Sequence, residues 1–109
     1  MRLAIATIAL LATLASHQAQ AVRFIGAGIM PCSAWTADHK RPTSPNAIMQ
    51  DQWVLGFISG GAARDPDENF DPLHGLEAFD VLFWVANWCQ ANPQVPVANA
   101  AGAFMLAHP

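Results

Sequence analysis

Between positions 65 and 71 the chain has an oxygen-bearing side chain at every second residue. This spacing is the closest in the sequence to that of a metal-binding loop. Calcium loops place an oxygen ligand at about every second position, so that successive side chains turn toward one ion. The EF-hand pattern is incomplete, because Phe70 stands where a glycine is required and Leu76 where a bidentate carboxylate is required. We therefore expect a solvated acidic loop and no metal site, with calcium binding as the alternative. The four candidate ligands are Asp65, Asp67, Asn69 and Asp71.

Other reactive side chains form no catalytic pattern. His39, His74 and His108 make no HxxxH or HxH pair that could hold zinc. The chain has no Gly-x-Ser-x-Gly nucleophile turn and no CxxC redox pair. Glu77 and Asp80 lie three residues apart, a spacing typical of negative charge at a helix N-terminus. We expect a protein that is not an enzyme and that carries no cofactor.

The first 21 residues predict the compartment. Arg2 supplies a positive start, residues 3–15 form an apolar run, and Ala19-Gln20-Ala21 is a small-x-small cleavage site. This is the pattern of a cleaved signal peptide, and the run is too short for an ordinary membrane span. We expect residues 1–21 to be a signal peptide and residues 22–109 to form one periplasmic or secreted domain.

Export determines the expected oxidation state of the two cysteines. In an oxidising compartment Cys32 and Cys89 are expected to form a disulfide. Removing 21 of 109 residues leaves 88, a small domain with a modest core. A bridge that closes a loop of 57 residues contributes roughly 4 kcal/mol in the chain-entropy estimate, which is comparable to the net stability of a small domain.

Charge argues against two classes of partner. Without Arg2, four Lys and Arg side chains oppose eight carboxylates, so the net charge of residues 22–109 is 4 − 8 = −4 with neutral histidines. A chain of this charge attracts neither nucleic acid nor an anionic membrane. We expect another protein as the partner, no nucleic acid, and no membrane span after cleavage of the leader.

Proline, serine and glycine divide the remaining chain into four expected helices. Ser44-Pro45 is a typical helix start, and Gly60-Gly61 a typical helix end. Asn92-Pro93 ends a further helix, because the residue before proline is pushed out of the α region. The expected helices cover residues 31–40, 45–60 and 76–91 and the segment from 96 onward, after an extended arm or short strand over 22–30.

The third expected helix carries the broadest apolar face and should form the centre of the core. Its disulfide to the first helix would lie beneath Trp35, one turn from Cys32. Two neighbouring stripes are expected to face inward, Ala78, Leu82, Val85 and Cys89, and Phe79, Phe83 and Ala86. In the last helix the inward side chains are expected to be Ala98, Ala101, Phe104 and Met105.

Three tryptophans leave two interpretations open. Trp84 and Trp88 are i, i+4 neighbours on one helix, and Trp53 lies on another. If these indoles faced water they would mark a partner-binding site. The interpretation we favour is that they flank the core and cover the disulfide, with one of them partly exposed.

Three blocks in order carry a resemblance to a known group of proteins. They are Cys32–Trp35 (C-x-x-W), Trp53–Gly60 (W-V-x-G-F-x-S-G) and Trp84–Pro93 (W-x-x-x-Y-C-x-x-N-P, with Trp88 in place of tyrosine). With them the chain resembles a group of small exported two-cysteine helical proteins of Gram-negative bacteria. More distantly it is similar in layout to periplasmic type VI secretion immunity proteins, although it lacks the second cysteine pair that some of them have, and to acid-stress chaperones of the HdeA kind. The resemblance implies a helical fold with one disulfide and action by binding other proteins.

These observations lead to one functional hypothesis and one alternative. We expect a periplasmic, non-enzymatic protein-binding module, immunity-like or chaperone-like. The alternative is an exported domain that binds a small ligand, or calcium through the loop at residues 65–71.

Overall fold

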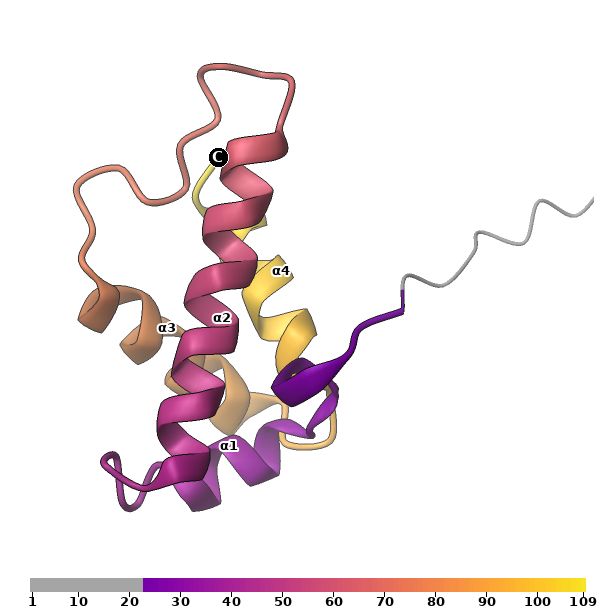
Figure 1. Cartoon of the computed structure of the whole chain (residues 1–109), viewed down its shortest axis with the longest axis vertical. Helices are drawn as coiled ribbons and strands as arrows, with labels where there is room; N and C mark the ends of the chain where they lie inside the picture. Colours follow the sequence, from indigo (N-terminus) through magenta and orange to yellow (C-terminus); the bar gives the residue numbers. More distant parts are fainter. Residues whose placement is uncertain (1–22) are drawn as a thin grey trace, which may run out of the picture.

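The computed structural model describes residues 23–109, which form an all-α fold stapled by one disulfide (Figure 1). One 3-10 turn, η1 (Gly26–Ile29), precedes four α-helices, and this part of the chain contains no named strand. The helices are α1 (Cys32–Asp38), α2 (Pro45–Arg64), α3 (Ala78–Ala91) and α4 (Val97–Ala107). The predicted all-α, four-helix class with a disulfide is confirmed. The predicted signal peptide lies outside the described residues.

Helix α2 is the long central element, with α4 beside it and α1 near its lower end in Figure 1. It begins where the sequence predicts. The Ser44 hydroxyl accepts a hydrogen bond from the Ala47 N–H (3.3 Å), and Pro45 takes the first helical position. Neither α2 nor any other helix between residues 23 and 109 is long and apolar enough to cross a membrane.

The predicted end of α2 at Gly60 and Gly61 is wrong, because the helix continues one turn further to Arg64. Glycine costs a helix about 1 kcal/mol relative to alanine, so two of them favour a stop. Packing against α4 opposes this preference. Gly61 lies so close to α4 that a Cβ there would stand 2.8 Å from the Met105 sulfur.

Helix α3 begins at Ala78, two residues later than the predicted start at Leu76. Its first turn is closed by a capping box in which Asp80 Oδ2 accepts a hydrogen bond from the Glu77 N–H (2.8 Å). The carboxylate pair Glu77 and Asp80 therefore acts as a helix cap, as their spacing indicates.

The core gathers around the disulfide between Cys32 of α1 and Cys89 of α3, where Trp35 is also fully buried. The predicted inward side chains of α4 are confirmed, since Ala98, Ala101 and Phe104 are buried and Met105 is half-buried.

The buried stripe of α3 is Val81, Val85 and Cys89, at four-residue spacing. The second predicted stripe is wrong, because Phe79 and Phe83 are exposed to 75% and 60%. Ala78, from the first predicted stripe, is also exposed, and Leu82 and Ala86 are half-buried. At 100° per residue, Phe83 points about 160° away from Val85, so one helix cannot bury both side chains against the same core.

The starts of α1 and α4 cap each other through the backbone. Each helix has proline at its N-cap, Pro31 and Pro96, and the two prolines form an isolated antiparallel bridge. The Cys32 N–H donates to the Val95 carbonyl and the Val97 N–H to the Met30 carbonyl, both at 2.8 Å. Proline has no side chain able to cap, so main-chain carbonyls satisfy the free N–H groups.

These contacts correct the predicted extended arm over residues 22–30. The described part of that segment turns through η1 and leaves only the single bridge at Pro31 as extended pairing. Pro31 itself lies just outside α1, which ends at Asp38 and not at Lys40.

Candidate functional site

The acidic loop directs its side-chain oxygens back to its own backbone. Asp65 Oδ1 accepts a hydrogen bond from the Asp67 N–H (2.8 Å), and Asp67 Oδ1 accepts one from the Asn69 N–H (2.9 Å). Asp71 lies 3.4 Å from the exposed His74 ring. Such side-chain turns are the ordinary role of aspartate in loops. Within residues 23–109 no three His, Cys, Asp or Glu side chains converge as a metal site.

Trp53, the first tryptophan of interest, holds the N-terminal segment on α2. Its indole N–H donates to the Ile25 carbonyl (2.9 Å), and its ring stacks on Phe57 with centroids 5.1 Å apart. Gly28 lies directly against the indole, since a Cβ at this position would stand 2.2 Å from the ring. Trp53 is half-buried and has a clear packing role.

Trp84 and Trp88 pack along α3. The Trp84 ring meets Phe104 of α4 edge-on (5.4 Å between centroids) and His108 in the same way (5.8 Å). Trp88 is half-buried against the core cluster that contains the disulfide. Partner binding by these three indoles stays a prediction, and the most exposed aromatic rings lie elsewhere.

A pair of parallel hydrogen bonds, unforeseen from the sequence, clamps the end of α1 to the start of α2. Gln50 Nε2 donates to Asp38 Oδ2 (2.7 Å), and the next residues along each helix, His39 and Asp51, meet at 2.6 Å. The other His39 nitrogen, Nδ1, lies 2.8 Å from the Trp35 carbonyl. A carbonyl and a carboxylate both accept, so both bonds form together only when His39 carries two ring protons, or when the Asp51 carboxyl is protonated.

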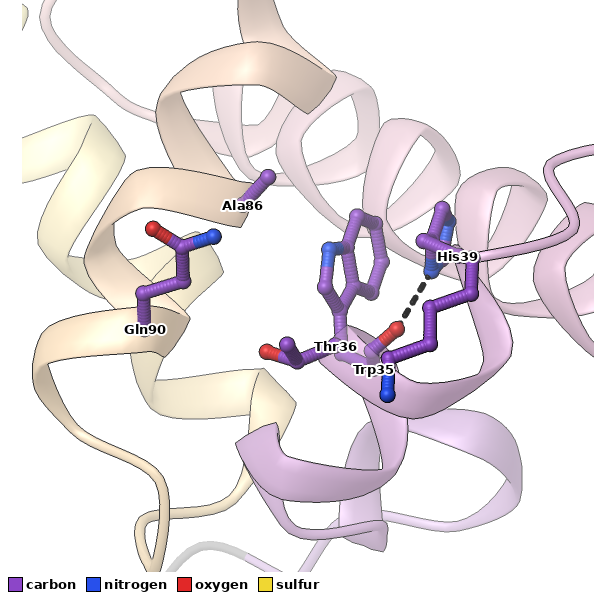
Figure 2. A pocket seen from close by; sticks show the side chains of 6 residues that line it. Trp35, Thr36, His39, Ala86 and Gln90 are labelled. Carbon is purple, nitrogen blue, oxygen red and sulfur yellow. Dashed lines mark hydrogen bonds between the residues drawn. The ribbon is translucent and has the colours of Figure 1, made fainter.

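A shallow pocket of about 330 Å³ opens between α1 and α3 (Figure 2). The indole nitrogen of Trp35 is buried without a hydrogen-bond partner, and Figure 2 shows it on the side of the ring that faces Gln90. The His39 imidazole engages both of its nitrogens, so neither is left to activate the Thr36 hydroxyl as a nucleophile. The lining residues are Trp35, Thr36, His39, Lys40, Ala86 and Gln90.

An exposed aromatic pair lies on the same side of α3 as this pocket. Phe79 and Phe83 stack with ring centroids 6.1 Å apart and planes within 19°. Ala86 and Gln90 follow Phe83 at three and seven residues, so the four residues line one side of the helix. We call this side, Phe79, Phe83, Ala86 and Gln90, the α3 flank. It is the strongest candidate for a contact surface.

The sequence did contain a signal for the α3 flank. The polar residues of α3, Asp80, Asn87 and Gln90, lie within about 80° of one another on one side of the helix, opposite the buried Val85. The polar side of a helix normally faces solvent. Phe79 and Phe83 fall on or beside that side, and this position is the signal for an exposed aromatic pair.

Comparison of the chain with protein-family models, with curated proteins and with solved structures finds no match in any of the three. The structural class of the protein is therefore taken from its fold and its candidate site. It is a small all-α domain with one buried disulfide and an exposed aromatic helix face.

Proposed function

We propose that this protein is a non-enzymatic, protein-binding module and that the α3 flank is its contact surface. The observation that carries the proposal is the exposure of the stacked rings of Phe79 and Phe83. Two phenylalanines held side by side in water lose apolar hydration when a partner covers them. Large buried aromatic side chains also supply much of the energy at protein interfaces.

We place this activity outside the cytoplasm, in the periplasm or the surrounding medium. The leader-like residues 1–21 and the disulfide between Cys32 and Cys89 support this location, since such bonds persist in oxidising compartments. An immunity-like or chaperone-like role fits a module that acts by covering a surface of another protein.

The alternative, an ion-binding domain, has less support. The candidate oxygens of Asp65 and Asp67 already accept hydrogen bonds from the loop backbone. Release of heat on addition of calcium in a calorimeter would favour that alternative.

Site-specific photo-crosslinking in the source cells tests the proposed surface. A photoreactive phenylalanine analogue at position 83 is expected to give a defined adduct with another protein. The same analogue at position 106 is the control, because Leu106 is an equally apolar side chain, 85% exposed, on a different helix.

The double variant Phe79→Ser/Phe83→Ser should lose the partner and keep its fold, because substitutions at exposed positions change stability by about 0.5 kcal/mol. Thermal unfolding checks the fold. Absence of an adduct from position 83, or equal adducts from positions 83 and 106, would overturn the proposal.

A further inference from the structure

We propose that the segment of the partner that covers the α3 flank is cationic and amphipathic, with apolar side chains flanked by Lys or Arg. This inference rests on the proposed function and adds the chemistry of the partner. It follows from how charge is distributed around the exposed phenylalanines.

Negative charge is concentrated in the segment that leads into α3. Six of the eight carboxylates between residues 23 and 109 lie in positions 65–80, and that segment contains no Lys or Arg. All six are exposed. They are Asp65, Asp67, Glu68, Asp71, Glu77 and Asp80.

Within residues 23–109, no ion pair with Lys or Arg neutralises these charges. The ion pairs found there join His39 to Asp51 and His74 to Asp71, and none involves Lys or Arg. Lys40 and Arg41 lie in the turn between α1 and α2, at the opposite end of α2 from the acidic segment (Figure 1). Arg64, the last residue of α2, directly precedes Asp65, so one exposed cation stands beside six exposed carboxylates. The acidic segment therefore projects its field into solvent.

The apolar pair and the charges share one end of one helix. Asp80 follows Phe79 directly and lies one turn before Phe83 on the helix surface. A partner that covers both rings must also bring its own groups close to Asp80 and Glu77. Carboxylates or neutral apolar groups there would leave these charges desolvated without a counter-charge.

The negative charge beside the α3 flank favours one kind of binding partner over the others. A second copy of this chain would bring two acidic segments together, and an anionic lipid surface would also be repelled. A basic amphipathic helix fits, because its apolar side chains at one-turn spacing can pack on the two rings. Its Lys or Arg groups can then meet the carboxylates and the faces of the rings.

Two labelled peptides of about 18 residues, long enough to become helical on contact, test this inference by fluorescence anisotropy with the full protein. Both carry the same leucine face, and the remaining positions are Lys in one peptide and Glu in the other. We expect the Lys peptide to bind at least about tenfold more tightly, and this advantage should shrink as salt is added.

Variants assign the effect to the two parts of the surface. Phe79→Ser/Phe83→Ser should abolish binding of the Lys peptide. Glu68→Gln/Asp71→Asn should weaken it several-fold, because two negative charges of the acidic segment are removed. Neither carboxylate makes a helix cap or a side-chain turn, and Asp71 loses only its exposed contact to His74. Arg41→Gln changes the charge at the far end of α2 and should have little effect.

Equal affinity for both peptides, with both lost in Phe79→Ser/Phe83→Ser, would overturn the charge inference and leave the proposed surface intact. Lys-peptide binding that ignores the phenylalanines would overturn it too, because attraction would then be purely electrostatic. Failure of the Lys peptide to bind also overturns it, while crosslinking from position 83 decides the proposed function separately.

Discussion

His39 and His108 end their helices in the same way. Each follows an aromatic residue by four positions and places Nδ1 2.8 Å from the carbonyl of that residue. Each ring also stacks on the aromatic side chain, Trp35 at 3.9 Å and Phe104 at 4.1 Å between centroids. In each case the histidine donates a hydrogen bond to a carbonyl of the last helical turn and packs on the face of an aromatic ring. Only His39 adds a carboxylate partner, Asp51.

We predict a strong coupling between His39 and Asp51. In a double-mutant cycle of His39→Ala and Asp51→Ala, the coupling free energy should be about 1 kcal/mol or more, since the contact is short (2.6 Å) and both side chains are only 19% exposed. Urea unfolding of the four proteins measures it.

The internal control is a second cycle that uses His108 in place of His39, because within residues 23–109 the His108 ring contacts the Phe104 carbonyl and no carboxylate. His108→Ala and Asp51→Ala should be additive within about 0.5 kcal/mol. Equal coupling in the two cycles would show that the short contact to Asp51 adds nothing.

At the scale of the element, the glycines within α2 and the glycine packed against it have opposite effects on stability. A Cβ at Gly56 or Gly60 would meet no atom within 4 Å, so these positions are exposed helix interior. Gly28 lies outside α2 but against its Trp53, where a Cβ has no room. The first two weaken the helix, while the third permits the N-terminal segment to dock.

Alanine at these glycines should therefore change stability in opposite directions. Gly56→Ala should raise the free energy of unfolding by about 1 kcal/mol through helix propensity. Gly28→Ala should lower it by about 1–3 kcal/mol, because the indole must move. Chemical denaturation measures both, and destabilisation by Gly56→Ala would mean that its open side is covered.

For the whole molecule, the disulfide is the main constraint. Cys32 and Cys89 are fully buried, and the bond joins the first residue of α1 to the last turn of α3 across 57 positions. The Cys32–Val95 and Val97–Met30 hydrogen bonds lie beside it, so the starts of α1 and α4 and the end of α3 meet at one place. Loss of the bond releases all three.

We predict that Cys32→Ala/Cys89→Ala costs about 4 kcal/mol of unfolding free energy, the chain-entropy value for a loop of this length. Guanidinium unfolding measures the loss. The single variant Cys32→Ala should cost a similar amount, because it breaks the same bond. A loss below about 1 kcal/mol would show that helix packing alone maintains the fold.

Local chemistry made the boundaries of several elements predictable. The Ser44 cap with Pro45, the stop at Asn92-Pro93 and the pairing of the two cysteines depend on residues that act over a few positions, or on the number of cysteines. The clamp formed by Asp38, Gln50, His39 and Asp51 was not predictable, because it depends on how the turn between α1 and α2 aligns two helices. The end of α2 likewise depended on Met105, far away in the chain.

The sequence by itself determined an all-α chain, four helices and a single cross-link, since backbone preferences and cysteine pairing need no knowledge of neighbours. The polar residues Asp80, Asn87 and Gln90 of α3 also favour burial of the opposite side, with Val81, Val85 and Cys89. Only the tertiary structure decided how far α1, α2 and α4 extend around this helix, because that depends on how the four helices pack. Their packing leaves Phe79 and Phe83 in solvent beside the acidic segment, where the proposed partner would bind.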